Sequence, residues 1–228
     1  MKNLRKDTVR TRKQLLNAAS GVFAEKGFRD STIAEICSRA GANVAAVNYH
    51  FGNKKNLYRE AWRHAFSESM KTCPPDGGIG SDASPEERLR GRITSLLKRI
   101  SSPDSHEFSI IHKELANPTG LLQEILQKEI NPQREAIHAI IRELLGSQAS
   151  SRQVHFCHTS IIGQCFHLIK IRQLLAKEKS GDHPCDIDDI EAYGEHIFHF
   201  SLAGILALRH HSSPGRDDEG SSRQEESR

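Results

Sequence analysis

The chain has 228 residues, of which 36% are apolar and 27% are charged, as is ordinary for a soluble globular protein. This length suggests one large or two small domains with a substantial hydrophobic core. The net charge of +3 hides an asymmetry, because residues 1–72 hold 14 Lys and Arg against 6 Asp and Glu, whereas the remainder holds 18 against 23. A basic N-terminal part on an acidic body suggests a polyanionic partner at one end, although a merely solvated basic face would have the same composition.

Cysteine usage and the hydrophobic segments of the sequence indicate in which cellular compartment we expect the protein. No CxxC pair occurs among the five cysteines, which are Cys37, Cys73, Cys157, Cys165 and Cys185. We therefore expect reduced thiols in the cytosol. No apolar signal-peptide region follows the basic N-terminus, and the apolar stretch 161–171 is too short and too polar to span a membrane. We expect a soluble, cytoplasmic protein with no membrane partner.

Hydrophobic periodicity predicts helices throughout the first 72 residues. A helix over 8–26 ends at Gly27, a short helix follows to Ala40, and a second short helix covers 44–50. A longer helix begins after the break at 52–53. We expect a helix-turn-helix DNA-binding domain over residues 1–52 and a connecting helix over 53–72.

A second helical region follows a flexible loop that is rich in Pro and Gly, at 73–84. Helices are expected at 85–100, 104–116, 121–145, 151–177 and 187–209, and Pro132 should kink or split the third. We expect residues 85–211 to form a second helical domain and the tail 212–228 to be disordered. No segment has strand periodicity, so the predicted fold is all-α. It comprises about nine helices, with a three-helix N-terminal domain followed by a larger helical domain.

Residues 31–50 have the length and punctuation of a helix-turn-helix: a short helix, a turn at Gly41-Ala42 and a second short helix. The second helix of such a unit fits the DNA major groove, which is about 12 Å wide, and the first braces it across the backbone. Gly41 supplies the tight turn between them.

The motifs in this region resemble those of the TetR family of regulators. They are Gly27-Phe28, the Ala40-Gly41 turn, His50-Phe51 and the run Asn53-Lys54-Lys55-Asn56-Leu57-Tyr58, and the likeness spans about residues 8–66. Over about 105–208 the chain resembles the C-terminal domain of the CecR-type branch, through the runs 112–118, 130–132 and 162–166. The resemblance implies a helix-turn-helix DNA-binding domain followed, over residues 85–211, by a larger helical ligand-binding and dimerisation domain. It further implies a sequence-specific regulator, in particular a ligand-responsive repressor released from operator DNA when a small molecule binds the C-terminal domain.

Two positions depart from the family pattern. Asn43 stands where Ser or Thr is more frequent, but Asn caps a helix equally well. Asn48 stands where the family more often has Tyr, with Tyr49 next, so either residue could make the usual phosphate contact.

The candidate DNA-binding residues follow from this unit. Lys54 begins a helix beside the recognition helix, where its amine and the free N–H groups suit a phosphate. The small side chains of Ala45 and Ala46 allow close approach and can touch a thymine methyl, or they reflect helix propensity alone. Thr32 is a cap, a phosphate ligand or both, and His50 is a DNA contact or a core residue. The full predicted set is Thr32, Asn43, Val44, Ala45, Ala46, Asn48, Tyr49, His50 and Lys54.

An effector pocket is expected between the helices at about 104–116, 121–145 and 151–177. We predict that it is lined by His112, Gln164, His167 and Arg172. Gln164 and His167 interrupt an apolar face, where an unpaired polar group is costly. They need a partner, which a ligand, a water, each other or a dimer mate could supply. By analogy with the family the effector is mostly apolar, drug-like or aromatic.

The helices at 151–177 and 187–209 carry more apolar surface than one buried face needs, so we expect a homodimer built on them. The predicted interface residues are Ile161, Leu168, Ile197, Leu202 and Ile205. Such a dimer would place two recognition helices in successive major grooves, about 34–36 Å apart, on a palindromic double-stranded operator.

Other chemistry finds less support in the sequence. His155-Phe156-Cys157-His158 and His196–His199 have helical spacing that could bring two metal ligands together, but no third ligand is identifiable, so no metal site is predicted. No nucleophile or phosphate-loop motif is present, so we expect neither an enzyme nor a cofactor. A small-molecule sequestration module with a vestigial DNA-binding domain is the rival hypothesis, and the basic N-terminal part argues against it.

Overall fold

The computed structural model describes residues 2–175, 187 and 189–211. Within these ranges the chain is helical and has no strand, which confirms the all-α prediction. The helices are α1 (Lys2–Asp30), α2 (Ile33–Ala40), α3 (Val44–Phe51), α4 (Lys54–Thr72), α5 (Pro85–Ser101), α6 (His106–Ala116), α7 (Gln123–Leu145), α8 (Ser151–Leu175) and α9 (Ile190–His211). None of these helices is long and apolar enough to cross a membrane.

Two boundaries differ from the expectation from sequence. Helix α1 starts at Lys2, before the predicted residue 8. At Gly27 its backbone is non-helical, with φ 75° and ψ −173°, so the helix is interrupted at the predicted residue and a short helical segment follows to Asp30. Helix α7 continues through Pro132 as one element and is not split there. The predicted tail, 212–228, and the end of the predicted helix 151–177 lie outside the described residues.

The helices pack around two hydrophobic cores. The first joins α1–α4 to α6 and to the start of α7, around the fully buried Phe23, Tyr58, Trp62 and Ile110. The second joins α5, α7, α8 and α9, around Leu97, Ile141, Ile161 and Ile197. Helix α6 therefore belongs to the core of the N-terminal helices although it follows them by more than 30 residues in sequence.

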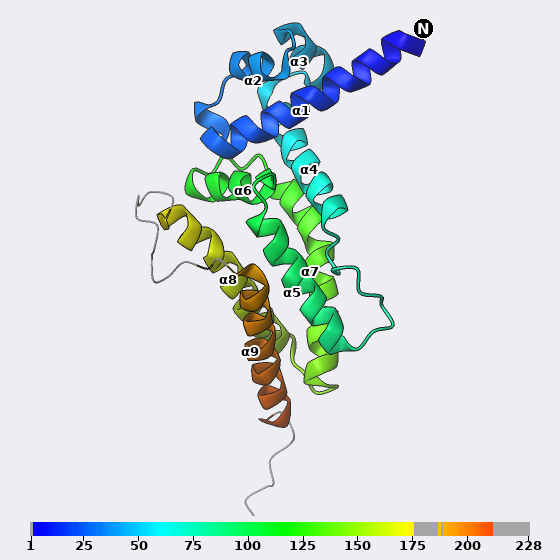
Figure 1. Cartoon of the computed structure of the whole chain (residues 1–228), viewed down its shortest axis with the longest axis vertical. Coiled ribbons are helices and arrows are strands. Elements are labelled where there is room, and N and C mark those ends of the chain that lie inside the picture. The colour runs from blue at the N-terminus through cyan, green and yellow to red at the C-terminus, as the bar shows by residue number, and fades with distance from the viewer. Residues whose placement is uncertain (1, 176–186, 188, 212–228) are drawn as a thin grey trace, which may run out of the picture.

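Figure 1 shows the consequence for the arrangement of the molecule. Helices α1, α2 and α3 gather at one end, with α6 next to them. Helix α4 leads from this end along the body, where α5, α7, α8 and α9 lie. Helices α4 and α6 thus connect the body to α1–α3.

Candidate DNA-binding surface and effector cavity

The turn between α2 and α3 is built from residues with matching backbone preferences. Thr32 caps α2 by accepting a hydrogen bond from the Glu35 N–H at 3.1 Å. Gly41 ends α2 in the left-handed region, at φ 61° and ψ 37°, a conformation that costs glycine little. Asn43 then caps α3, its side-chain oxygen accepting from the Ala45 N–H at 2.9 Å. These contacts fix the angle between the two helices.

Helix α3 has one buried and one exposed face. Val47 is fully buried and Phe51 is 6% exposed, and both belong to the first core. The opposite face carries Val44, Ala45 and Asn48, which are exposed, and Tyr49, which is 78% exposed. An exposed aromatic ring on a small-residue helix is suited to packing against a sugar or donating to a phosphate.

Lys54 is less free than its predicted phosphate role suggests. Its ammonium donates to the Ser31 carbonyl and lies 4.7 Å from the centre of the Phe28 ring, and its side chain is half-buried. Burial lowers the pKa of Lys54. It therefore ties the start of α4 to the turn before α2. Since an ammonium has three donors, this leaves capacity for a phosphate.

His50 is half-buried at the edge of α3, and Tyr49 packs edge-on against it, with ring centres 4.9 Å apart. Burial, aided by the nearby Arg12 charge, lowers the pKa of His50. Arg12 itself lies over the Phe51 ring at 5.3 Å and pairs with Glu60 at 3.0 Å. The basic flank beside α3 is thus partly fixed by contacts within the protein.

A cavity of about 180 Å³ lies between α4, α5, α6, α7 and α8. Most of its wall is apolar, including Trp62, Phe66, Phe108, Ile111, Ile162 and Phe166. The cationic side chains of Arg92, Arg99 and Arg134 also line it, together with Glu107 and His158. Two buried polar atoms of this wall, Trp62 Nε1 and Glu107 Oε2, have no hydrogen-bond partner. The wall therefore combines a large apolar surface with a few polar groups that a ligand could satisfy.

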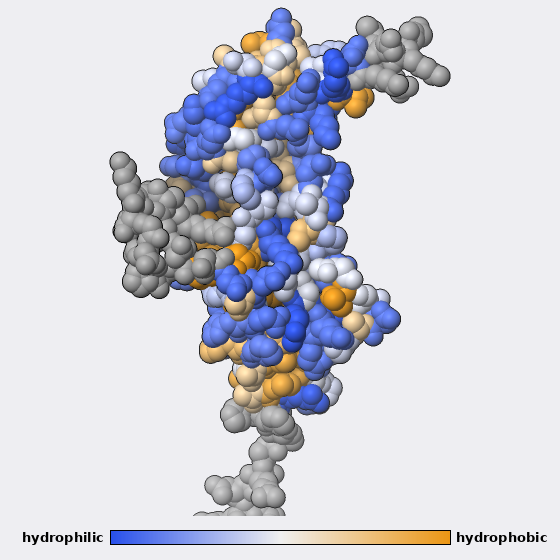
Figure 2. All heavy atoms as spheres, in the orientation of Figure 1, coloured by the Kyte–Doolittle hydropathy of each residue, from blue (hydrophilic) through white to orange (hydrophobic). Residues whose placement is uncertain are grey.

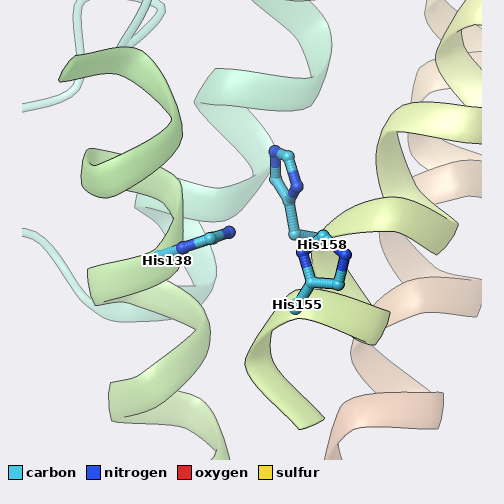
Figure 3. Close-up of side chains that lie close together, drawn as sticks. All are labelled: His138, His155 and His158. Carbon is cyan, nitrogen blue, oxygen red and sulfur yellow. The ribbon is translucent and has the colours of Figure 1, made fainter. Parts of the chain in front are cut away.

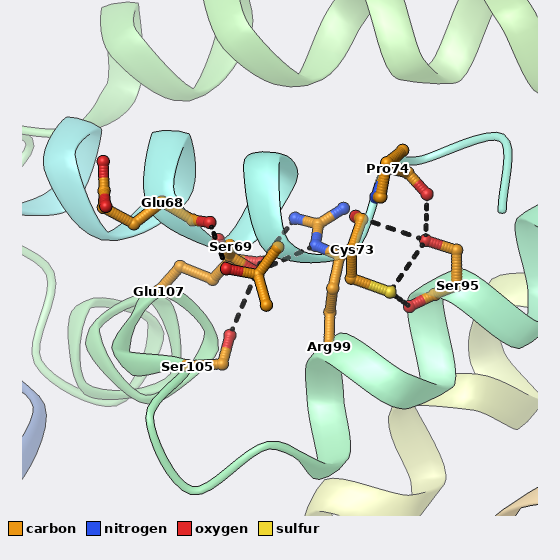
Figure 4. A network of polar contacts seen from close by, with 9 residues as sticks. Glu68, Ser69, Cys73, Pro74, Ser95, Arg99, Ser105 and Glu107 are labelled. Atoms are coloured by element: carbon orange, nitrogen blue, oxygen red, sulfur yellow. Dashed lines mark hydrogen bonds and ion pairs between the residues drawn. The ribbon is translucent and has the colours of Figure 1, made fainter. Parts of the chain in front are cut away.

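Glu107 and Arg99 form a buried ion pair in this wall (Figure 4). Ser69 on α4 joins them, because its hydroxyl donates to Glu107 Oε1 at 3.2 Å and accepts from Arg99 Nε at 3.1 Å. Burial raises the pKa of Glu107 to about 7, although the Arg99 charge and its hydrogen bonds act in the opposite direction. One polar cluster thus connects α4, α5 and α6 at the cavity.

A second set of contacts connects α6 to the N-terminal helices. The Tyr58 hydroxyl on α4 donates to Glu114 on α6 at 3.0 Å, in a buried position. Glu114 also accepts from the backbone N–H groups of Thr119 and Gly120, and so holds the segment after α6. Arg59 Nε donates to the carbonyl of Leu121 at 3.1 Å. Helix α6 and the segment before α7 are therefore tied to α4 by hydrogen bonds, of which that between Tyr58 and Glu114 is buried.

Comparison with known proteins agrees with this architecture. Residues 15–61 match the bacterial regulatory proteins of the tetR family, and residues 85–205 match the C-terminal domain of the HTH-type transcriptional dual regulator CecR. The chain belongs to the TetR family of bacterial transcriptional regulators.

Individual relatives have the same organisation. The chain is 26% identical to the dual regulator CecR of Shigella flexneri over 166 residues, which is 67% of this chain and 73% of that protein. A transcriptional regulator from Rhodococcus sp. RHA1 superposes with a TM-score of 0.63 at 20% identity, covering 86% of this chain and 96% of that one. The regulator FadR from Bacillus subtilis, solved in complex with stearoyl-CoA, gives 0.62 at 18% identity, with coverage of 84% and 98%. As a TetR-family member, the chain is a DNA-binding transcriptional regulator, as the sequence predicted.

Three of the effector-site residues predicted for this TetR-family chain, His112, Gln164 and His167, do not line the cavity. His112 is half-buried on α6 and His167 is exposed on α8. The Gln164 amide donates to the Ser160 carbonyl at 3.1 Å and to the Ser201 hydroxyl at 3.4 Å, so it already has partners where α8 meets α9. The side chain of Arg172 lies outside the described residues. The cavity does lie among the predicted helices, but other side chains form its wall.

The predicted dimer residues require a correction. Four of them, Ile161, Leu168, Ile197 and Ile205, are at most 3% exposed inside the second core, and Leu202 packs against that core half-buried. The surface of these four is buried by packing within one protomer, so they cannot also face a partner, whereas Leu202 keeps part of its surface exposed. The side chains of α8 and α9 that remain outside include Phe156 and Phe200, which are 54% and 65% exposed. Figure 2 shows hydrophobic surface along this part of the body.

The sequence contained a partial signal for the cavity that the prediction missed. Glu107 and Glu114 share one face of α6 with Ile110, which is completely buried. A carboxylate on a buried face requires a specific partner. The partners, Arg99 and Tyr58, come from α5 and α4, and no local pattern identifies them.

Proposed function

We propose that this protein is a homodimeric repressor that binds a palindromic operator through α3 and is released when an amphipathic anion enters the cavity between α4 and α8. The single observation that carries this proposal is that α4 and α6 line the cavity and also pack in the core of the DNA-binding helices. A ligand that prefers a different spacing of these two helices shifts the recognition helices with them.

The wall of the cavity supports a particular ligand chemistry. Its apolar side chains favour a hydrocarbon or aromatic body. Three arginines, Arg92, Arg99 and Arg134, face one carboxylate of the wall, Glu107, which pairs with Arg99; Arg134 also lies 3.6 Å from the exposed Glu135 carboxylate. A carboxylate or phosphate on the ligand would complement this excess. The stearoyl-CoA of the FadR structure likewise joins an apolar chain to anionic groups.

The exposed faces of α8 and α9 support the dimer. Gly163 and Gly204 lie inside these helices, where glycine costs about 1 kcal/mol relative to alanine. Both are exposed, and a Cβ atom added at either would meet nothing within 4 Å in the protomer. Glycine is therefore not required there by packing within one chain. Close approach of a partner helix explains both positions, with Phe156 and Phe200 beside them as apolar contacts.

The chain provides its own reporter for a test of ligand binding. Trp62 is its only tryptophan, and it lines the cavity, stacked on Phe66 with ring centres 5.1 Å apart. Titration with medium-chain and aromatic carboxylates should change the tryptophan fluorescence in a saturable manner. The neutral primary amides of the same acids serve as matched ligands and should bind at least about tenfold more weakly, because they lose the charge interaction.

Arg134→Gln tests the same point from the protein side. The Arg134 side chain is exposed, so we expect its replacement to leave the hydrophobic core intact. The variant should bind the acids more weakly and the amides unchanged. If the unmodified protein bound acid and amide with equal affinity, this would contradict the proposal that the cavity prefers an anionic ligand.

A further inference from the structure

Three histidines that are not part of the proposed DNA-binding surface meet between α7 and α8 (Figure 3). His138 comes from α7, and His155 and His158 come from successive turns of α8. One ring nitrogen of each lies within 4.8 Å of those of the other two. His138 and His158 pack edge to face, with ring centres 4.8 Å apart. Helical i, i+3 spacing brings the α8 pair together, and α7 supplies the third ring.

One atom in this group lacks a partner. His138 Nε2 is buried and forms no hydrogen bond. A buried polar nitrogen without a partner is destabilising, so its retention calls for a bound group that satisfies it. An imidazole nitrogen with a free lone pair is the commonest protein ligand for a transition metal.

We infer that His138, His155 and His158 form a binding site for a borderline divalent transition-metal ion of the zinc type. Imidazole suits Zn²⁺, whereas Mg²⁺ and Ca²⁺ prefer oxygen ligands. Three protein ligands with an open fourth position are typical of zinc sites that also take water or a small ligand. Ligand nitrogens around tetrahedral Zn²⁺ lie about 3.4 Å apart, given Zn–N distances near 2.0–2.1 Å, so modest side-chain rotations close the set.

The site shares a wall residue with the effector cavity, since His158 lines that cavity from α8. If the proposed function holds, a metal ion that fixes the His158 ring alters one side of the cavity, and the two ligands are thermodynamically linked. This linkage rests on the proposed function, whereas metal binding by the three histidines does not.

The test uses the full-length protein without an affinity tag. Calorimetric titration with ZnCl₂ should give one high-affinity ion per protomer, and Zn²⁺ should raise the thermal midpoint. His155→Ala removes an exposed ligand without disturbing the core. His138→Leu removes the unpartnered nitrogen, so the metal-free variant should be at least as stable as the unmodified protein. Each should weaken Zn²⁺ binding by at least about tenfold and abolish the thermal shift.

His196→Ala is the matched control, because His196 is an exposed histidine on α9. It should leave Zn²⁺ affinity unchanged.

Substitution with Co²⁺ tests the ligand atoms. It should give visible bands of a nitrogen-ligated tetrahedral ion without thiolate charge transfer, since the nearby Cys157 is buried in the second core. Unchanged Zn²⁺ affinity in His155→Ala and His138→Leu, or a thiolate band, would overturn the three-histidine site. A Zn²⁺ affinity that is the same with and without a saturating carboxylate ligand would contradict the linkage and leave the metal site standing.

Discussion

Lys54 and Tyr49 lie near each other in sequence but have different surroundings, which separates their expected effects. Lys54 holds the turn before α2 through the Ser31 carbonyl and the Phe28 ring. Lys54→Ala should therefore lower the stability by about 1–2 kcal/mol and should also weaken binding to all duplexes by a similar factor. Denaturant unfolding and fluorescence anisotropy with specific and random DNA measure the two effects. Loss of discrimination between sites with full non-specific affinity would contradict the phosphate role.

Tyr49 differs from Lys54, because it is 78% exposed and its ring packs edge-on against His50. Tyr49→Ala should leave the stability within about 0.5 kcal/mol of the original value and weaken operator binding by about 1–2 kcal/mol. Leu115→Ala, at a residue that is 73% exposed on α6, is the control and should alter neither quantity. A Tyr49 variant with normal operator affinity would remove this residue from the DNA-binding surface.

The raised pKa of Glu107 makes a prediction about pH. The pKa of this carboxyl group is about 7 in the folded protein and has its ordinary value in the unfolded chain. At a pH between the two pKa values, folding is therefore accompanied by uptake of a proton. Its contribution to stability is complete at low pH and is lost as the pH rises through 7. The unfolding free energy should therefore fall by roughly 1 kcal/mol more between pH 6 and pH 8 in the unmodified protein than in Glu107→Gln. Parallel pH profiles for the two proteins would show that Glu107 remains ionised when folded.

At the level of helices, α8 and α9 should form the dimer through their exposed faces. Phe200→Asp places a charge on an outward side chain, so the protomer should fold while the dimer dissociates. Gly163→Leu adds bulk where the protomer has open space and should have the same effect. Both should weaken operator binding, since a single recognition helix contacts only one half-site.

Sedimentation at micromolar concentration measures the dimer directly. Leu115→Asp, on an equally exposed apolar residue of α6, is the matched control and should remain dimeric. Dimers of undiminished stability in both Phe200→Asp and Gly163→Leu would move the interface elsewhere.

Sequence periodicity predicted the helices well because helix boundaries depend on local chemistry. Caps such as Thr32 and Asn43 and the turn glycine Gly41 act within a few residues of their own position. Whether an apolar helix face is buried in the core or contacts a partner could not be predicted in the same way. Ile161 and Ile197 are as apolar as an interface residue would be, and only the packing of α8 and α9 against α5 and α7 places them in the core.

The same reason applies to the cavity and the histidine cluster. Arg99 meets Glu107 across a helix boundary, and His138 meets His158 across the α7–α8 contact. These pairs depend on how whole helices pack, and this is not encoded in the spacing of residues along one helix. The helix-turn-helix itself was accessible to sequence reasoning because it is a short local unit, and the assignment of individual DNA contacts on it stays a prediction.

Two properties of the whole molecule bear on DNA binding: the distribution of charge, and the proposed coupling between the cavity and the DNA-binding helices. The N-terminal part carries the excess positive charge, so DNA binding should weaken steeply with salt through counterion release. Helices α4 and α6 connect the cavity to the DNA-binding helices through two polar clusters, one around Glu107 and one around Glu114. By linkage, any ligand that lowers operator affinity must itself bind more weakly to the DNA-bound protein by the same factor.

The most direct test of the account is the operator affinity with and without a ligand that the Trp62 fluorescence shows to be bound. Anisotropy of labelled DNA from upstream of the protein's own gene, measured at fixed salt, provides this value. We predict that a saturating amphipathic acid weakens operator binding by at least about tenfold, which corresponds to a coupling free energy of about 1.4 kcal/mol. An acid that saturates the Trp62 signal and leaves operator affinity unchanged would contradict the proposed coupling between the cavity and the DNA-binding helices.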